Sequence, residues 1–353
     1  MIPYYALVLI PYGIFLALSG RRKVSSALLR GVTLTVFFSI LFCLLALRDE
    51  TCGIDLARYA LKYDEAANAS WAEVWRSEKD TGYYLLQKLI RTCTADFGLF
   101  LAVIAFLALV GLWIFYVRES GHAPLTLVLF LTVAPFTMFF SGLRQILAMA
   151  WTVPAWCFAR DNKLFRFLFA VAAASLFHMS GIVLLLLYPA CRIRITPKWF
   201  YGLAPMMAAV LFLNKPIFRL FMQITGYDTY AMSDTGAYTV LILLVLFTVY
   251  VFVVPDESLL DKDTVALRNL LVLSVFLQCF APVHTLAMRV NYYFLLFVPV
   301  LISRIPDRAS RLWRPVARVS VWVMLLFFTG WFFLQAHMGA DKLHVFPYVF
   351  RYA

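Results

Sequence analysis

Apolar stretches long enough to cross a lipid bilayer recur along the whole chain. About 20 consecutive apolar residues suffice to span the hydrocarbon core. We expect membrane segments near 2–19, 27–47, 97–117, 123–141, 144–159, 199–213, 238–254, 269–287, 289–303 and 319–338. Hydrophobic residues make up 63% of the 353 residues, whereas soluble domains hold roughly 45–50%. The pattern excludes a soluble globular enzyme and a disordered chain, and predicts an all-α polytopic membrane protein.

The positions of basic clusters indicate whether the ambiguous stretch 164–190 crosses the membrane once or forms a hairpin. It can form one long tilted helix, or two short helices that turn near His178 and Gly181. Lysines and arginines stay on the cytoplasmic side of membranes, and basic clusters flank this stretch at both ends. A hairpin keeps every such cluster on the cytoplasmic side. We therefore predict about twelve membrane segments, two of them short, with both termini outside.

This topology predicts a single integral membrane domain, 1–353, whose polar parts lie mainly outside. The long outer loop 48–96 contains two stretches, 55–76 and 80–92, with the pattern of short amphipathic helices at the interface. A second outer loop is expected at 214–237. The net charge of +12 then reflects membrane topology and not nucleic-acid binding. Cys52 and Cys93 both fall in the long loop, and the sequence leaves open whether they form a disulfide.

Motifs of nucleotide and metal chemistry are absent from the sequence. It contains no G-x-x-x-x-G-K-[ST] phosphate loop, no G-x-G-x-x-G and no H-E-x-x-H, which are the usual signatures of such sites. The five histidines are scattered without ligand spacing. We expect no ATP-driven pump and no metal site or other cofactor.

Polar and charged side chains, which are energetically unfavourable in a bilayer, gather at the predicted outer ends of the spans. Charged residues in such places are functional candidates. Arg48, Arg144 and Arg289 could together hold a diphosphate, because guanidinium groups pair bidentately with phosphate oxygens. The candidate general bases are Asp55, Glu78 and His178. Further binding candidates are Arg58, Tyr83, Gln145 and Tyr292.

Each of these residues also has a structural interpretation. The arginines can be interface anchors whose charged ends reach toward water, and Asp55 can stabilise a helix N-terminus. Glu78 can be a solvated loop charge, His178 a histidine satisfied between helices, and the tyrosines members of an aromatic belt. Their common outer side favours the functional interpretation.

An ordered set of short motifs resembles the EpsG family, relatives of the Wzy O-antigen polymerases. The motifs are R-D-E-T-C-G-I-D-L-A-R-Y (48–59), E-K-D-T-G-Y-Y-L-L (78–86), G-L-R-Q-I-L-A (142–148), F-H-M-S (177–180), R-V-N-Y-Y-F (289–294) and F-P-Y-V-F (346–350). They run over nearly the whole chain in the expected order.

The resemblance implies a fold loosely related to the GT-C glycosyltransferases and a bacterial inner-membrane enzyme whose active site faces the periplasm. It implies that oligosaccharide repeat units on undecaprenyl diphosphate serve as donor and acceptor, without metal or nucleotide. A flippase and a chain-length regulator are expected partners, beside the bilayer itself. Two alternatives stay open: a transporter that flips lipid-linked oligosaccharides, and a ligase of the O-antigen type.

Overall fold

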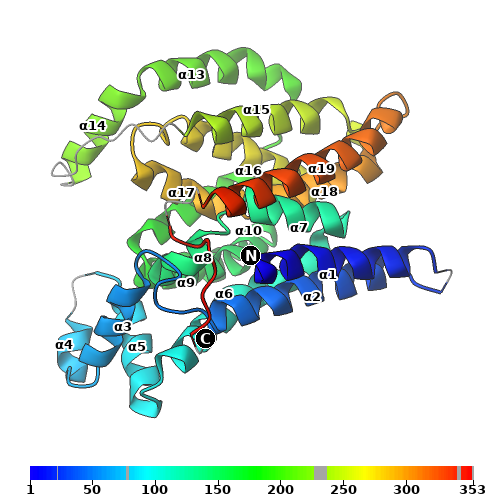
Figure 1. Cartoon of the computed structure of the whole chain (residues 1–353). Coiled ribbons are helices and arrows are strands. Elements are labelled where there is room, and N and C mark those ends of the chain that lie inside the picture. The colour runs from blue at the N-terminus through cyan, green and yellow to red at the C-terminus, as the bar shows by residue number, and fades with distance from the viewer. Residues whose placement is uncertain (22, 77–78, 226–236, 340–342, 352–353) are drawn as a thin grey trace. The chain divides into compact units, whose positions relative to one another are not determined.

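The computed structural model describes residues 1–353 except 22, 77–78, 226–236, 340–342 and 352–353. All regular secondary structure of this described part is helical, and it contains no β-strand. The α-helices are α1 (Ile2–Ser19), α2 (Ser26–Ala46), α3 (Leu56–Glu65), α4 (Trp71–Trp75), α5 (Thr81–Cys93), α6 (Phe97–Glu119), α7 (Ala123–Thr132), α8 (Met138–Ser141), α9 (Leu143–Ala150), α10 (Thr152–Arg160), α11 (Leu164–Phe177), α12 (Leu187–Ala190), α13 (Phe200–Phe212), α14 (Asn214–Thr225), α15 (Tyr238–Val253), α16 (Lys262–Gln278), α17 (Thr285–Leu295), α18 (Val298–Arg304) and α19 (Arg314–Met338) (Figure 1).

The chain divides into two compact units. Unit 1 comprises Met1–Leu185 and Val321–Ala353, and unit 2 comprises Leu186–Ser320. In unit 1, α2 packs against both α1 and α6, and α9, α10 and α11 pack together. In unit 2, α16 is the central helix and contacts α12, α15, α17 and α18.

Four helices are long and apolar enough to cross a membrane: α1, α2, α6 and α19. Only 22% to 44% of the most apolar 18-residue stretch of each helix is buried inside the protein. Large apolar side chains such as Leu16 (65% exposed) and Leu326 (76% exposed) therefore point outward. Helices that are apolar all round require an apolar solvent. The molecule is an all-helical, multi-pass membrane protein. Its described residues contain four candidate spans, or six if two bent helix pairs each count as one.

Two predicted spans of unit 1 are interrupted in the structure. The stretch 123–141 consists of α7 and the short α8, because helix α7 ends at Thr132 shortly before Pro135. Proline disfavours helical geometry in the residue before it. The stretch 144–159 consists of α9 and α10, which meet at Trp151. Uniform apolar composition does not reveal such breaks.

The stretch 164–190 is broken where the hairpin turn was predicted. Helix α11 ends at Phe177, His178 is extended with φ −159°, and a 3₁₀ helix follows over Met179–Leu186. The amide of Gly181 donates to the carbonyl of His178 at 2.8 Å. A continuous helix over this stretch is thus excluded.

In unit 2, α13 and α15 match the predicted spans 199–213 and 238–254 to within one residue, whereas other boundaries differ. The span predicted at 269–287 is α16, which starts at Lys262 because Asp261 caps it by accepting from the Thr264 amide at 2.6 Å. The span predicted at 289–303 is α17 and α18, which belong to a pair bent by 45°. The outer loop predicted at 214–237 begins with helix α14, bent 74° from α13.

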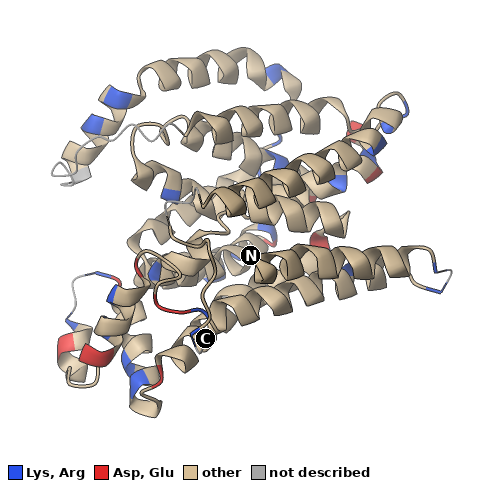
Figure 2. Ribbon diagram, in the orientation of Figure 1, with Lys and Arg blue, Asp and Glu red and all other residues tan. Residues whose placement is uncertain are grey.

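The predicted outer loop 48–96 contains α3, α4 and α5, which lie together beside the start of α6 (Figure 1). Charged residues are dense on these three helices and sparse on α1, α2 and α6 (Figure 2). The inner faces of α3 and α5 are fixed by a hydrogen bond from the Tyr63 hydroxyl to the Thr94 carbonyl at 2.8 Å. This small helical layer carries the polar chemistry of unit 1.

Candidate functional site

A carboxylate at the start of α5 gathers two of the predicted site residues. Arg144 Nη1 donates to Asp80 Oδ2 at 2.8 Å. His178 Nδ1 lies 3.4 Å from both Asp80 oxygens, and the Met179 amide donates to Oδ1 at 3.2 Å. We call Asp80, Arg144 and His178 the acidic–basic cluster. It joins three segments that lie far apart in the sequence.

The backbone around Asp80 is unusual. Asp80 has φ 55° and ψ 35°, the left-handed conformation that few residues other than glycine adopt. Two residues later, a Cβ on Gly82 would come within 3.0 Å of both Cβ and O of Leu176. Gly82 therefore permits α5 to approach α11 closely, just before His178. Non-glycine residues in this conformation are strained and concentrate at functional sites.

Arg144 lies on α9, whereas its partner Asp80 lies at the start of α5. Its Nε also donates to the Tyr59 hydroxyl on α3 at 3.4 Å. The Asp80 side chain is only 4% exposed, whereas the Arg144 side chain is 36% exposed. The cluster thus hides its negative charge and presents its positive charge outward, where an anion can meet it.

Burial alone would raise the pKa of the Asp80 carboxyl, because burial disfavours the charged form. The hydrogen bond and the charge of His178, together with the Arg144 charge, outweigh that effect and lower the pKa below its ordinary value of 3.8. Asp80 is therefore a carboxylate at neutral pH. Conversely, burial raises the pKa of the Tyr59 hydroxyl, which stays protonated and can act as a donor.

Asp55, a predicted base, is not part of the acidic–basic cluster. It contacts Ser141, three residues before Arg144. Ser141 at the end of α8 donates to Asp55 Oδ2 at 3.3 Å and accepts from the Asp55 amide at 3.3 Å. Gly53 makes this approach feasible: its φ is 133°, and a Cβ there would lie 2.2 Å from the Phe140 carbonyl oxygen. Asp55 is half-buried.

Arg48 is almost completely buried, with 1% exposure. It donates to the carbonyl of Leu45, and its guanidinium lies 5.6 Å from the centre of the Phe140 ring. Its backbone forms a bridge with Phe350. Burial lowers its pKa to about 10. In this conformation, Arg48 supports the packing of the C-terminal segment against the start of the outer loop.

The other predicted binding residues of unit 1 differ in accessibility. Tyr83 is 1% exposed, its ring lies 5.7 Å from that of Tyr59, and its hydroxyl has no hydrogen-bond partner within the described chain. Gln145 is 2% exposed and follows Arg144 on α9. Arg58 is exposed on α3. Of these three residues, Tyr83 and Gln145 are buried and Arg58 is accessible.

Three predicted residues are not part of the unit 1 arrangement described above. Arg289 and Tyr292 lie on α17 in unit 2, where both are half-buried. Glu78 lies outside the described residues. The grouping of Arg289 with Arg144 thus stays a prediction.

Cys52 and Cys93 are not joined by a disulfide in the structure. Cys52 is buried, and its Sγ lies 3.6 Å from the Val345 carbonyl oxygen, whereas Cys93 is exposed at the end of α5. No group of three or more His, Cys, Asp or Glu side chains suited to a metal ion occurs in the described ranges.

Asp80 is the residue that sequence reasoning missed. It stands inside the motif E-K-D-T-G-Y-Y, which the sequence comparison singled out without giving Asp80 a role. Asp80 stands directly before α5, but its side chain makes no capping hydrogen bond to that helix. Its partners are 64 and 98 residues away, and only the tertiary structure reveals them.

A model of the EpsG family matches residues 31–350, nearly the whole chain. The chain belongs to the EpsG family. This is a family of Wzy-like polysaccharide polymerases, which implies a glycosyltransferase-type activity. No curated protein and no solved structure matches the chain. All members of the acidic–basic cluster lie within the region that the EpsG family model covers.

Proposed function

We propose that this EpsG protein polymerises oligosaccharide repeat units at the outer face of the bacterial cytoplasmic membrane. The growing glycan moves from one undecaprenyl diphosphate to a sugar hydroxyl of another lipid-linked unit. The observation that carries the proposal is the exposed guanidinium of Arg144, held by a buried carboxylate beside a histidine, in a member of a polysaccharide polymerase family.

On the donor side, Arg144 binds the diphosphate. The oxygen of the acceptor hydroxyl attacks the anomeric carbon of the donor sugar, and the bond from that carbon to the diphosphate oxygen breaks. The diphosphate leaves with the bonding electrons and gains negative charge. A preorganised cation stabilises such developing charge. Asp80 and Tyr59 contribute by fixing the Arg144 side chain before the substrate arrives.

On the acceptor side, His178 takes the proton of the attacking hydroxyl. Asp80 faces Nδ1 of the imidazole, which leaves Nε2 as the atom that accepts the proton. A carboxylate that holds a histidine in one tautomer is the arrangement of many nucleophile-activating sites. The 3.4 Å separation is long for a hydrogen bond, and catalytic hydrogen bonds often tighten only with substrate bound.

The remaining predicted residues are proposed as alternative bases or as further substrate-binding residues. Asp55 and Glu78 are the alternative bases, and Asp55 is the one whose position beside Ser141 is described. Arg48 and Arg289 are proposed as further diphosphate ligands, and Arg58, Tyr83, Gln145 and Tyr292 as residues around the sugars. Arg48 and Tyr83 would have to leave their buried positions to touch a substrate.

The site is proposed to face the periplasm, because the segment 48–96, which supplies Tyr59 and Asp80, follows α2 at the end opposite the basic residues at 21–23. Polymerisation needs neither metal nor nucleotide in this scheme, since cleavage of the diphosphate ester drives the reaction. A flippase that supplies lipid-linked units and a chain-length regulator are the proposed partners.

Reconstitution into liposomes with an undecaprenyl-diphosphate-linked repeat unit tests the function. We expect a ladder of products on a gel, without added metal or nucleotide. A single added block would instead indicate a ligase. Translocation of the lipid without any new glycosidic bond would indicate a transporter and contradict the proposal.

A further inference from the structure

An open cavity lies in the helical layer of unit 1, apart from the acidic–basic cluster. It measures about 210 Å³ and is formed by α3, α4, α5 and the turn after α3. The lining residues are Lys62, Glu65, Ala66, Ala69, Glu73, Val74, Tyr84 and Gln87. Pockets for drug-sized ligands measure roughly 300–1,000 Å³. This cavity therefore suits a single small ring.

Gln87 is the residue that most suggests a ligand. It lines the cavity, its side chain is 2% exposed, and its Nε2 has no hydrogen-bond partner within the described chain. Leaving a buried donor unpaired costs about 1–3 kcal/mol. A ligand with an acceptor oxygen in the cavity would remove that cost.

The other side chains supply complementary chemistry. Tyr84 is half-buried and offers an aromatic face. Glu73 binds the Ser70 amide through Oε2 at 2.6 Å, and its second oxygen can accept a hydroxyl hydrogen. Lys62 and Glu65 form an ion pair of 2.7 Å at the exposed rim. An aromatic face, an amide and carboxylates, with two acids to one base, favour an uncharged polyhydroxylated ring over an acidic one.

The cavity walls are held in place before any ligand binds. Lys88 is buried and donates from Nζ to the carbonyls of Ala66 at 2.9 Å and Ala67 at 3.1 Å. This contact fixes the end of α3 against α5. Ser70 and Glu73 form a reciprocal capping box that fixes the start of α4. A preformed cavity binds with a smaller entropic penalty than one that must be ordered.

Helix α5 connects this cavity to the acidic–basic cluster. Asp80 precedes the first turn of α5 and Gln87 follows seven positions later, so the two lie about 10 Å apart along the helix axis at 1.5 Å per residue. Tyr84 lies between them, and its ring is 5.4 Å from that of Tyr83. A short oligosaccharide can therefore occupy the cavity with one sugar and reach the cluster with another.

We propose that this cavity is a subsite for one uncharged pyranose ring of the repeat unit. The choice of sugar rests on the proposed function, whereas the cavity and its unpaired amide do not. By holding a sugar that does not react, the subsite would select the repeat unit and position its neighbour at the cluster. Binding that is equal in ground and transition states changes KM and leaves kcat unaltered.

The test uses saturation-transfer NMR on the full chain in detergent, with a panel of soluble methyl pyranosides as probes. The panel contains the gluco, galacto, manno, 6-deoxy and N-acetylamino forms and one uronic acid. We expect saturation transfer to at least one uncharged glycoside, and loss of that transfer in Gln87→Met and Tyr84→Ala. Leu89→Ala, an exposed position of α5 outside the cavity lining, should bind as the wild type does.

Gln87→Met keeps the length of the side chain and removes the unpaired donor, so its thermal stability should equal or exceed that of the wild type. Absence of transfer to every glycoside, persistence of full transfer in either variant, or a preference for the uronic acid would overturn the subsite. These results do not depend on polymerisation. A wild-type protein that binds the glycoside but makes no ladder would contradict the proposed function and leave the subsite standing.

Discussion

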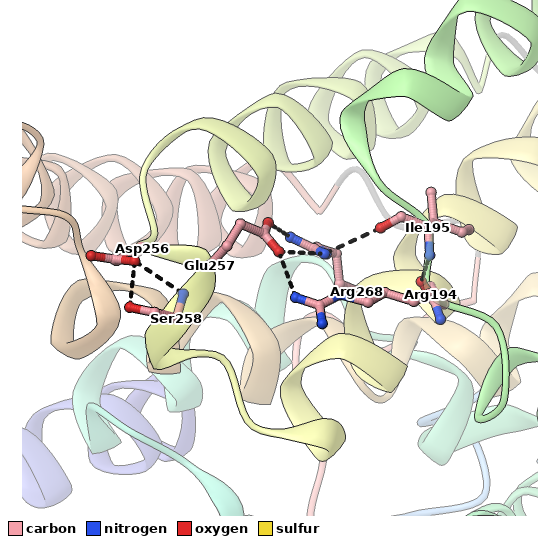
Figure 3. A network of polar contacts seen from close by, with 7 residues as sticks. Arg194, Ile195, Asp256, Glu257, Ser258 and Arg268 are labelled. Carbon is pink, nitrogen blue, oxygen red and sulfur yellow. Dashed lines mark hydrogen bonds and ion pairs between the residues drawn. The ribbon is translucent and has the colours of Figure 1, made fainter.

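Units 1 and 2 each contain a network of charged side chains, and the two are built in opposite ways. In unit 1 the carboxylate of Asp80 is buried, and the cation of Arg144 is 36% exposed. In unit 2 the cation of Arg268 is 0% exposed, and the carboxylate of Glu257 is 42% exposed. Figure 3 shows Glu257 between Arg268 and Arg194, with Arg268 also donating to the Ile195 carbonyl at 3.2 Å.

The difference separates a binding site from a structural anchor. The guanidinium of Arg268 lies 4.2 Å from the Phe252 ring centre and reaches protein acceptors with both terminal nitrogens. It joins the segments around Ile195 and Glu257 to α16 and presents no charge to a ligand. Arg144, in contrast, is held on one side and open on the other. An incoming diphosphate can therefore complete the contacts of Arg144 but not those of Arg268.

The largest effect is expected from Arg144→Ala in unit 1. Removing a preorganised group that stabilises developing charge typically lowers kcat by about 10²–10³-fold. Polymer formation in liposomes should fall by that amount while the protein remains folded. Arg118→Ala, an exposed arginine in the last turn of α6, is the matched control and should keep wild-type activity.

Glu257→Ala should instead affect stability. It leaves the fully buried Arg268 without its carboxylate, and breaking a buried pair from one side costs roughly 3–5 kcal/mol. Because Glu257 is partly exposed, we expect a loss of unfolding free energy near the lower end of that range. Thermal unfolding in detergent measures it. Arg194→Ala, with a side chain 60% exposed, should cost about 1 kcal/mol or less. Equal effects of Glu257→Ala and Arg194→Ala would contradict the assignment of the Arg268–Glu257 pair as a structural anchor.

Asp80→Asn should reduce activity by about 100-fold, the lower end of the roughly 10²–10⁴-fold that general acid–base catalysis contributes. The amide keeps the shape of the side chain and removes the charge that orients both Arg144 and His178. His178→Ala should have a comparable effect. If the two residues act as a unit, the double variant should be little worse than either single one. Additive losses would show that Asp80 does not act through His178.

The smallest effect concerns acid stability. The folded protein lowers the pKa of Asp80 below 3.8, so this carboxylate contributes stability at pH values above its unfolded pKa. That contribution is lost as the pH falls through the lowered pKa. The melting temperatures of wild type and Asp80→Asn should therefore differ by a constant amount near neutral pH and converge in acid. A gap that widens in acid would contradict the ionised state assigned to Asp80.

The sequence predicted the uninterrupted helices of both units well and the interrupted spans poorly. Helices α1, α2 and α6 lie within one or two residues of their predicted bounds, because polar or turn-forming residues flank each apolar run. Helix α16 begins with polar residues that hydropathy assigns to a loop, and Asp261 caps it. Breaks such as the one at Trp151 depend on packing, which composition does not record.

The residues of the site differed in how far the sequence revealed them. Arg144 and His178 were predictable, since a charged residue at the end of an apolar span is conspicuous. Asp80 was not, because an aspartate among Glu78 and Lys79 in a polar loop resembles any solvated charge. Its burial arises only when Gly82 lets α5 approach α11. Arg48 shows the opposite case: it was conspicuous in the sequence and is buried beneath the C-terminal segment in the structure.

The most direct test of the account is the binding of undecaprenyl diphosphate, the proposed leaving group, by native mass spectrometry of the purified protein. We predict that Arg144→Ala weakens this binding at least about tenfold, which corresponds to about 1.4 kcal/mol, while Glu257→Ala and Arg118→Ala bind as the wild type does. Undiminished binding by folded Arg144→Ala, or an equal loss in Glu257→Ala, would contradict the assignment of the diphosphate to the acidic–basic cluster.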